Sequence, residues 1–503
     1  MKKIIAMLLV ILTLSMLLVS CKKDPVTDPT NSDPTTTTPG NTDDPNRVAP
    51  EVKDFGKYEF KFMMDLQTDY EVQVPEEVGN DGINKALVER NNKVAELYNV
   101  KISEKRNTYS STDAAFTYLK NMNESGDYFA DIYSNYAIKM IQNHSVAGVY
   151  LNVCELDSLR LDEEWWDQDF VEEFKINNHL YTLTGDIQTN DDLHEIFTSM
   201  NLTLYNQTYP EKNFYEIVVK NGAWTWDEFY NTWYGFGSND GGQSGVVDAD
   251  DKVAYYYDCR TVSYMYMASG LKAFTMVNNK PELTISSGKA LTICVDRMQQ
   301  ILDGHSNFKS VRLDDSTVRP DSYSGGNLHF ASGKVLFISC NFTDALQYQL
   351  DMEHTVVYPP FPKYEGGQER YYSLVHKDFE PIAISSQVRD KERTALLTEA
   401  LCFYSDKLEE EVMKVLLRER LTAEPETRMI LQLTLDSKVY DMEYTANIMG
   451  WTGMVNDTLF TKNQLTKYSE EAGKLANQAI NTRGTGTLEN FLKAYAGLNY
   501  AQR

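Results

Sequence analysis

Adjacent carboxylates are the residues of this sequence with the most direct capacity for chemistry. Two carboxyl groups at the right separation can hydrolyse a glycosidic bond, one as general acid and the other as nucleophile or base. Glu163-Glu164 and Asp191-Asp192 are pairs of this kind. The chain has 73 acidic residues among 503, however, so such pairs arise without any catalytic role. Surface charge is the favoured interpretation, and a glycoside hydrolase is kept as the alternative.

Motifs of other catalytic and metal-binding classes are absent from the sequence. It contains no G-x-S-x-G, no Walker lysine and no H-E-x-x-H, and Gly235-Phe236-Gly237 lacks the third glycine of a dinucleotide-binding loop. The 7 histidines are scattered, and no C-x-x-C pair occurs among the 6 cysteines. A zinc site or redox centre is therefore not indicated. We expect no catalytic residue, no metal and no cofactor.

An acidic loop from Gly237 to Asp251 is the one segment that resembles a calcium site. It carries Asp240, Asp248, Asp250 and Asp251. An EF-hand loop needs D-x-[DN]-x-[DN]-G and a Glu at the twelfth position, and this segment departs from that spacing. The favoured interpretation is a solvated acidic loop, with calcium binding left open.

The overall charge argues against nucleic-acid binding. The chain has 48 Lys+Arg and 73 Asp+Glu, a formal net charge of −25, and so lacks the basic surface that phosphate contacts require. Its hydrophobic content of 42% is enough for a large folded core. Aromatic residues reach 12%, with 32 Tyr; some of them are expected in the core, and lobes rich in Tyr fit a glycan better than an amino acid.

The N-terminus has the order of residues found in a secretory signal. Lys2 and Lys3 precede an apolar run from Ile4 to Val19, which is short for a bilayer span of about 20 residues. The final residues, Leu18-Val19-Ser20-Cys21, resemble a bacterial lipobox. We therefore predict a signal peptide over residues 1–20 and lipidation of Cys21. The chain would then sit on the extracytoplasmic face of the cell membrane; an uncleaved membrane anchor is the alternative.

Residues 21–49 are expected to be a disordered tether behind the lipidated cysteine. The stretch from Asp24 to Pro45 is dominated by Pro, Thr, Asp and Asn and has almost no apolar residues. Such a composition cannot offset the entropy of ordering. A coil of this length reaches about 30 Å, or about 85 Å when extended like polyproline.

From residue 50 the hydrophobic pattern alternates between strands and helices. The spacing predicts a strand at 58–64, a helix at 83–97 closed by Asn99, a strand at 100–102, a helix at 114–122, a strand at 130–133 and a helix from 136. Repetition of this kind with short loops predicts a parallel, doubly wound sheet. Ligands bind at the carboxyl ends of such strands, so the loops after Met64 and Tyr133 are expected to line a cleft.

A second block runs from about 190 to 370. Trp224 and Trp226 open an amphipathic segment and are expected in the core, whereas Trp165 and Trp166 fit core packing and cleft lining equally well. Further elements are expected as strands at 330–338 and 381–384 and a long helix at 395–421.

Several stretches in a fixed order give the chain a family resemblance. They are Glu89-Arg90-Asn91, Tyr98-Asn99-Val100, Gly126-Asp127-Tyr128, Asp131-Ile132, His179-Leu180-Tyr181, Gly185-Asp186, Leu204-Tyr205-Asn206, Trp224-Thr225-Trp226-Asp227-Glu228-Phe229, Gly333-Lys334-Val335-Leu336-Phe337, Pro359 to Tyr364 and Tyr371-Tyr372. Together they cover about residues 57–450 behind the lipobox and tether. In this combination the chain resembles the extracellular solute-binding proteins, family 1 type, of bacterial carbohydrate ABC importers, in their lipoprotein form.

The resemblance implies two α/β lobes joined by a hinge, a periplasmic-binding-protein-like (type II) fold with the ligand cleft between the lobes. It places the first lobe at 50–187 with a return at about 372–405. The second lobe is placed at 188–371, and a helical part at 406–503 is expected to pack mainly on it. The ligand would bridge both lobes and stabilise the closed state. No reaction is catalysed in such a protein.

Candidate ligand contacts follow from sugar chemistry and from these lobes. Sugars offer a polar rim and an apolar face, so their sites combine aromatic rings with Asp, Asn and Gln side chains. Candidates were chosen after strand ends, near the expected lobe crossings and in a C-terminal Gly-Trp turn. They are Asn135, Tyr136, Asp186, Asp192, Tyr264, Asn341, Phe342, Tyr372 and Trp451.

The expected partners are a small-molecule ligand, taken to be a carbohydrate, and the permease of an ABC transporter. Membrane contact is expected through the lipid on Cys21, and the chain is expected to be a monomer that binds no nucleic acid. Two alternatives remain: a lipid-anchored surface glycoside hydrolase, and a glycan-capture lipoprotein built from helical repeats. The repeat architecture predicts a helical period of about 34 residues, whereas this chain begins with alternating strands and helices.

Overall fold

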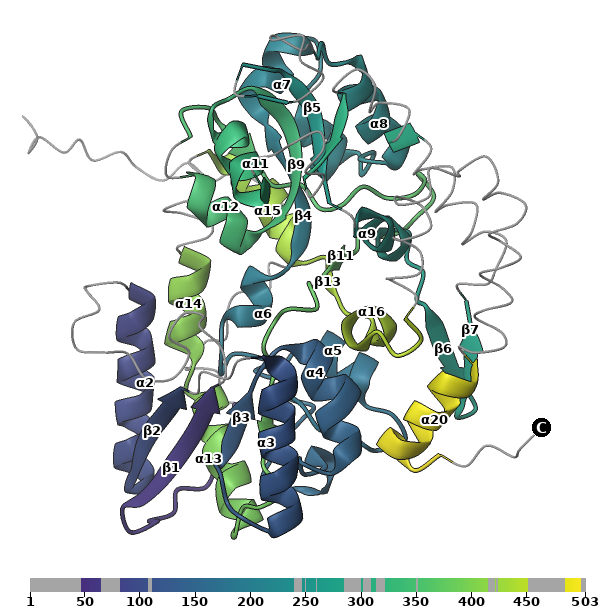
Figure 1. Ribbon diagram of the computed structural model, residues 1–503. Coiled ribbons are helices and arrows are strands. Elements are labelled where there is room, and N and C mark those ends of the chain that lie inside the picture. Colours follow the sequence, from purple (N-terminus) through teal and green to yellow (C-terminus); the bar gives the residue numbers. More distant parts are fainter. Residues whose placement is uncertain are drawn as a thin grey trace, which may run out of the picture. The chain divides into compact units, whose positions relative to one another are not determined.

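The computed structural model describes the folded part of the chain with several gaps. It describes residues 47–64, 82–106, 111–238, 247–248, 250–258, 260–284, 300–301, 309–313, 322–349, 352–414, 421, 424–450 and 485–498. All of these residues belong to one compact unit, Gly40–Arg503. Within it, two separate sheets are each packed with helices (Figure 1).

The first sheet is mostly parallel. Its strand order is β12-β3-β1-β2, with β1 at Tyr58–Met64, β2 at Val100–Arg106, β3 at Ile132–Ser134 and β12 at Ile382–Ile384. Strand β1 pairs in parallel with both β2 and β3, as the sequence pattern predicted. Strand β12 joins β3 in the antiparallel sense, so the prediction of an all-parallel sheet is wrong at this edge. An antiparallel edge strand on a parallel sheet is common in α/β folds, and here it comes from a distant part of the chain.

Two helices of the first sheet begin and end where local signals require. Helix α2 (Gly82–Tyr98) ends at Asn99, which adopts a left-handed φ of 48°. Helix α3 (Thr112–Ser125) begins after Ser111, whose side chain accepts a hydrogen bond from the amide of Ala114. It ends at Gly126, with a φ of 72° that favours glycine. The helices predicted at 83–97 and 114–122 are thereby confirmed, each a little longer than expected.

The second sheet is mixed, with the order β10-β4-β9-β5-β8. The strands are β4 (Ile196–Asn201), β5 (Val253–Tyr257), β8 (Ser310–Arg312), β9 (Val335–Asn341) and β10 (Val356–Val357). Strand β5 is parallel to β8 and β9, whereas β4 is antiparallel to both β9 and β10. Nearly every residue of β4, β5 and β9 is buried, which explains the continuous apolar runs Val253–Tyr257 in β5 and Val335–Ile338 in β9.

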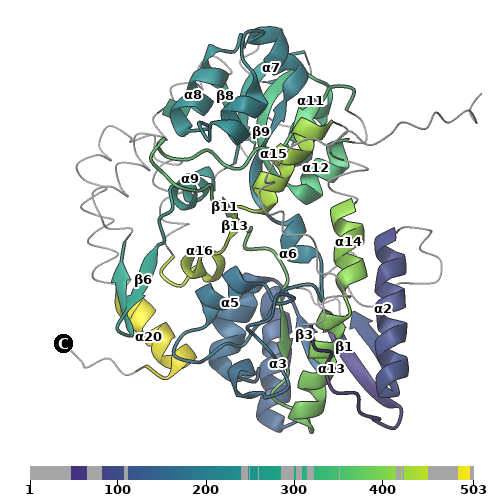
Figure 2. The ribbon, with the colours of Figure 1, turned by 180° about the vertical axis from the view of Figure 1, so that it is seen from behind.

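Helices cover this second sheet. They are α7 (Leu202–Thr208), α8 (Trp226–Gly235), α11 (Ser322–Ala331), α12 (Phe342–Gln349) and α15 (Pro425–Leu435), whereas α9 (Thr261–Ala268) contacts β11 (Ser373–Leu374). In both views α11 and α12 lie side by side, and both contact β9 (Figure 2). Trp224 and Trp226, at the start of α8, are 0% and 2% exposed, so their predicted place in the core is confirmed.

Several segments link the two sheets. The first leads from β3 to β4 through α4 (Ala137–Lys139), α5 (Gln168–Phe174) and α6 (Asn190–Leu193), and the second leads from β10 to β12 through β11 (Ser373–Leu374). Strand β11 pairs in parallel with β13 (Lys438–Val439), from the C-terminal part of the chain. Helix α16 (Met442–Ala446) follows β13 and contacts α4. The lobe boundaries given above remain a prediction.

The remaining described elements lie toward the C-terminal half. The helix predicted at 395–421 is broken into α13 (Lys391–Phe403) and α14 (Asp406–Lys414), with turn residues Tyr404 and Ser405 between them. The other elements are the hairpin of β6 (Phe274–Val277) and β7 (Lys280–Leu283), and helix α20 (Thr485–Ala496). None of the helices in the described part of the chain is both long and apolar enough for a membrane span.

Trp165 and Trp166, whose roles the sequence left open, are both buried in the core. Their indole N–H groups donate to the two carboxylate oxygens of Glu399, at 3.1 Å and 2.9 Å, and the Arg160 Nε donates to the same carboxylate at 2.8 Å. One fully buried side chain thus accepts all three donors.

Replacing Glu399 by leucine should therefore lower the free energy of unfolding by about 3 kcal/mol, because it leaves two buried indole donors and a guanidinium without their acceptor. Urea denaturation of the purified protein measures the loss. Glu392→Leu, which removes an exposed carboxylate at the start of the same helix, is the control. Equal stability of the two variants would contradict a structural role for Glu399.

Candidate ligand-binding site

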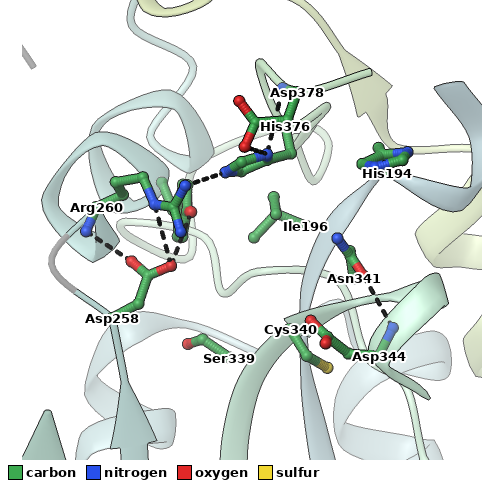
Figure 3. A pocket seen from close by; sticks show the side chains of 11 residues that line it. His194, Ile196, Asp258, Arg260, Ser339, Cys340, Asn341, Asp344, His376 and Asp378 are labelled. Carbon is green, nitrogen blue, oxygen red and sulfur yellow. Dashed lines mark hydrogen bonds and ion pairs between the residues drawn. The ribbon is translucent and has the colours of Figure 1, made fainter. Parts of the chain in front are cut away.

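A cavity of about 180 Å³ lies at one end of the strands of the second sheet (Figure 3). It is lined by His194, Ile196, Asp258, Arg260, Tyr264, Ser339, Cys340, Asn341, Asp344, His376 and Asp378. Strands β5 and β9 both end at this edge, and the antiparallel β4 begins there, since Ile196 pairs with Asn341. The cavity therefore occupies the carboxyl ends of the parallel strands, where open α/β sheets bind ligands.

One side of the cavity is built around Asp258 and Arg260, on the connection from β5 to α9. One Asp258 carboxylate oxygen accepts the backbone N–H of Arg260 at 2.6 Å. The other accepts the Tyr264 hydroxyl at 3.0 Å and lies 3.4 Å from the Arg260 Nε. These contacts hold the guanidinium in a fixed place at the cavity wall. Figure 3 shows this pair beside His376.

His376 follows β11 and receives a hydrogen bond from the Arg260 guanidinium at its Nε2. A guanidinium only donates, so Nε2 acts as an acceptor toward Arg260. Nδ1 lies 3.3 Å from the backbone N–H of Asp378 and 3.5 Å from its carboxylate. Burial, followed by the charge of Arg260, lowers the pKa of His376 well below its ordinary value. The imidazole is therefore neutral at physiological pH and orients the arginine rather than carrying charge.

His194 lies on the other side of the cavity, at the end of α6. Its Nδ1 donates to the backbone carbonyl of Asn190 at 2.7 Å, which leaves Nε2 as an acceptor. Burial lowers the pKa of His194 although the carboxylates of Asp378 and Asp344 act to raise it. A neutral imidazole with an acceptor nitrogen thus stands near two carboxylates.

Asn341 and Asp344 meet at the start of α12. The Asn341 side-chain oxygen accepts the backbone N–H of Asp344 at 3.0 Å and so caps the helix, and Asp344 accepts the side-chain amide of Asn327 at 3.0 Å. Burial alone would raise the pKa of Asp378, but the charges of Lys377 and Arg260 lower it, so this carboxylate is ionised. The polar groups of the cavity are thus held in place by helix caps and hydrogen bonds.

Of the predicted contacts, Tyr264 and Asn341 lie in the cavity lining. Phe342, the neighbour of Asn341, does not. It is completely buried in the core, with its ring centroid 4.4 Å from that of Phe197, because the first residue of α12 points into the packed face of the helix. The prediction that Phe342 contacts ligand is therefore not supported by its position.

Asn135 and Tyr136 follow β3, next to the segment that carries His376, but neither is in the cavity lining. Asn135 is 1% exposed and donates its amide to the Tyr133 hydroxyl at 2.8 Å. Tyr136 is half-buried, and burial together with the charges of Glu380 and Asp378 raises its pKa. The amide of Ala137 donates to the carbonyl of Phe379 at 2.8 Å, which fixes this loop against the cavity segment.

Tyr372 is not in the cavity lining, and the Arg370 guanidinium lies 5.0 Å from its ring centroid. Trp451, Cys21 and the loop after Met64 lie outside the described residues. So does most of the acidic loop at 237–251, and no group of three or more possible metal ligands occurs among the residues that the structure describes.

Asp186 and Asp192 belong to a separate charged group, here called the Lys438 cluster: Lys438, Asp167, Asp191, Asp192 and Tyr440, with Asp186 close by. The Lys438 Nζ lies 2.7 Å from Asp167, 3.3 Å from Asp191 and 2.7 Å from Asp192. The Tyr440 hydroxyl is 3.0 Å from both Asp167 and Asp191. The cluster ties α5 and α6 to β13, so Asp192 is placed for a structural role.

Burial dominates the acid–base behaviour of this cluster. It raises the pKa of Asp186 to about 8, with Asp192 adding to the effect, and raises the pKa of Asp191 to about 7 against the opposing charge of Lys438. The pKa of Lys438 is itself raised well above its ordinary value because three carboxylates outweigh its burial.

Sequence reasoning missed most of the cavity. His194, Asp258, Arg260, His376 and Asp378 were not among the candidates, and the histidines were set aside as scattered. Asp258 could have been found, since it directly follows the apolar strand Val253–Tyr257, and the strand-end rule that selected Asn135 applies to it equally. No sequence signal links His376 to Arg260, which are 116 residues apart.

Several solved structures share this architecture. A cyclo/maltodextrin-binding protein in complex with maltotetraose matches with a TM-score of 0.55 and 13% identity, over 86% of this chain and 99% of the other. The galacto-N-biose/lacto-N-biose I-binding protein of a Bifidobacterium longum ABC transporter matches with a TM-score of 0.53 and 12% identity, over 89% and 100%. A family 1 extracellular solute-binding protein from Alicyclobacillus acidocaldarius matches with a TM-score of 0.51 and 13% identity, over 86% and 100%.

Two designed esterases also match, with TM-scores of 0.55 and 0.53, so the fold alone does not define an activity. No protein-family model and no curated protein matches the sequence. At identities of 10–13% the structural matches establish architecture. The chain has the two-lobed α/β fold of the family 1 extracellular solute-binding proteins.

Proposed function

We propose that this protein captures a carbohydrate in the cavity beside Asp258 and Asn341 and delivers it to an ABC permease. The observation that carries the proposal is the position of the cavity, at the carboxyl edge of the second sheet and against the segment that links the two sheets. Proteins of this fold in complex with maltotetraose and with lacto-N-biose support the ligand class.

The lining offers the groups that sugar hydroxyls need. The His194 Nε2 and the carboxylates of Asp344 and Asp378 accept hydrogen bonds, and the Asn341 side-chain amide can donate one. Arg260 is held by Asp258 and His376 before any ligand arrives. Groups fixed in this way lose little entropy when a ligand binds, which favours affinity.

Closure of the two lobes over the ligand is the second part of the proposal. Helix α16 lies between the parts that would move: the Tyr444 ring centroid is 6.2 Å from that of Tyr264 and 6.4 Å from that of His376. On its other side, the Gln142 amide reaches the carbonyl of Asn447. Tyr136, next to the cavity segment, is the aromatic side chain of the first lobe that we expect to cover a bound sugar ring on closure.

Attachment to the membrane completes the proposed function. Cys21 would carry lipid, and residues 22–49 would hold the folded unit away from the membrane surface on the extracytoplasmic side. The first described residue, Arg47, is fixed to the folded unit through an ion pair with Asp406 and a cation–π contact 4.9 Å from the Phe403 ring centroid. We therefore expect the tether to end, and the folded unit to begin, at Arg47.

Thermal unfolding in the presence of mono- and oligosaccharides, amino acids and short peptides tests this function. We expect stabilisation by one class of carbohydrate, with the sugar recovered intact. A ligand at 100 times its dissociation constant adds about 2.7 kcal/mol to the free energy of unfolding and raises the midpoint by about 3 °C in a protein of this size. Recovery of a shortened glycan would overturn the proposal in favour of a hydrolase, and stabilisation by amino acids or peptides alone would overturn the carbohydrate class.

A further inference from the structure

Two of the segments that link the sheets pair with each other beside the cavity and form a short ribbon, here called the histidine ribbon: residues 194–196 and 373–376. Its two strands are antiparallel, and the amide of His376 donates to the carbonyl of His194 at 2.8 Å. Both histidines line the cavity, and Figure 3 shows them there. The position of the ribbon therefore decides where the two imidazoles stand.

Glu195 lies on the face of the histidine ribbon that points away from the cavity. Successive side chains of an extended strand point to opposite faces, and His194 and Ile196 line the cavity whereas Glu195 does not. Its bridge partner Val375 shares its face. Glu195 is 0% exposed, and neither of its carboxyl oxygens has a hydrogen-bond partner among the residues that the structure describes. A carboxyl group buried in this way is costly in its charged form, so the neutral acid is favoured.

The charges around Glu195 do not remove that cost. Lys438 is aligned with Ser373 across β13 and β11, but its ammonium already lies within 3.3 Å of three other carboxylates. Asp192 and Asp436 add negative charge. Burial raises the pKa of Glu195 well above its ordinary value, although Lys438 and Ser373 act to lower it. For an acid of this kind the contribution to stability is complete below about pH 4 and is lost as the pH rises through the raised pKa.

We propose that Glu195 is a neutral acid that fixes the histidine ribbon, and that loss of its proton releases the ribbon and, with it, one wall of the cavity. An ionised Glu195 needs water or a cation, and either one reaches this buried face when the two strands part. His194 and His376 then lose their positions together, because the hydrogen bond between their backbones belongs to the ribbon. The cavity therefore holds its ligand more weakly at alkaline pH, whatever the class of that ligand.

Infrared difference spectroscopy of the purified full chain, with Glu195→Gln as the reference, tests whether the proton is present. Neutral and ionised carboxyl groups absorb at different frequencies, and the difference spectrum separates Glu195 from the other buried acids. We expect the band of a neutral acid at pH 6 and its loss at a higher pH, before pH 10. The band of an ionised carboxylate at pH 6, or a neutral band that persists at pH 10, would overturn the proposal.

Hydrogen exchange of the backbone amides of residues 373–376 tests the release of the ribbon. The amides of Val375 and His376 donate to backbone carbonyls at 3.0 Å and 2.8 Å, so both are protected while the strands are paired. After correction for the intrinsic effect of pH on exchange, we expect their protection to fall at least about 10-fold as Glu195 loses its proton. Glu195→Gln mimics the neutral acid and should keep its protection within about 3-fold over the same pH range.

Two further variants complete the test. Glu369→Gln is the matched control, because Glu369 is exposed on the segment that leads into β11, and it should follow the unaltered chain. Glu195→Met has a similar volume and no proton to lose, so it should be as insensitive to pH as Glu195→Gln. If either variant of Glu195 showed the same pH dependence as the unaltered chain, the proton of Glu195 would not control the ribbon. No ligand is added, so failure of this proposal leaves the proposed function standing.

Discussion

Replacing Lys438 by methionine should lower the free energy of unfolding by about 3–5 kcal/mol at pH 8, because it removes the partner of several buried charges. The ammonium of Lys438 lies within 3.3 Å of Asp167, Asp191 and Asp192. Without it, these carboxylates either remain charged in a poorly solvated site or take up protons. Methionine fills a similar volume, so the loss reports charge rather than packing. Urea denaturation at fixed pH measures it.

The same variant should be less destabilised at pH 5. Burial raises the pKa of Asp186 to about 8 and that of Asp191 to about 7, both above the ordinary value of 3.8. For an acid whose pKa is raised on folding, the folded state binds more protons, so its contribution to stability is complete below about pH 4 and is lost as the pH rises through 7 and 8. At pH 5 both groups are protonated and need Lys438 less. Loss of the lysine should therefore matter most above pH 7.

Lys220→Met is the matched control for this prediction. Lys220 forms an exposed pair with Glu216 one helical turn away, and its removal should leave stability unchanged at both pH values. If Lys438→Met were as stable as the control, or lost the same free energy at pH 5 and pH 8, the buried cluster would not have the electrostatic role described here.

Asp258→Ala should weaken ligand binding by at least about 100-fold, which corresponds to about 2.7 kcal/mol. We expect this loss because Asp258 holds its neighbours in position. It accepts the backbone N–H of Arg260 and the hydroxyl of Tyr264, and it lies beside the Arg260 guanidinium that reaches His376. Without this carboxylate the arginine is no longer held against one wall, and one whole side of the cavity loses its order. Calorimetric titration with the ligand identified by the sugar panel measures the effect.

Tyr264→Phe and Asp250→Ala make this experiment interpretable. Tyr264→Phe removes a single hydroxyl donor to Asp258 and should weaken binding by about 10-fold or less, since a typical hydrogen bond contributes about 1 kcal/mol. Asp250→Ala removes an exposed carboxylate outside the cavity and should not change affinity. Unchanged affinity in Asp258→Ala would mean that the ligand binds elsewhere.

Much of the fold could be predicted from local sequence patterns. Alternation from Tyr58 to Met64 and helical spacing up to Asn99 are short-range signals, and the structure confirms both elements. The patterns failed where pairing partners are distant. Strand β12 pairs with β3 in the antiparallel sense although their sequences are about 250 residues apart, and nothing within Ile382–Ile384 specifies that direction. The break at Ser405 was hidden by apolar spacing that continues through both α13 and α14.

The cavity residues were harder to predict from the sequence, because their partners are also distant along the chain. Asn341 was found because it was expected to follow the strand entered through Gly333, and it is the last residue of β9. Tyr264 was chosen as a residue of the second lobe, and it lies in α9. His194 and His376 have no motif, since each acts through a partner supplied by the fold: a carbonyl for His194 and a guanidinium for His376. Asp192 was expected to contact ligand because it lies near a lobe crossing. It is instead held by Lys438, which is 246 residues away.

We expect a carbohydrate to occupy the cavity between Asp258, Asn341 and His376, and a crystal structure of the protein with the sugar that stabilises it would show whether it does. We expect an intact sugar in that cavity, within hydrogen-bond distance of the His194 Nε2 and of at least one of Asp344 and Asp378, with Tyr136 closer to the cavity than it is here. A sugar bound at another surface, a cleaved sugar, or a cavity left without sugar would contradict this expectation.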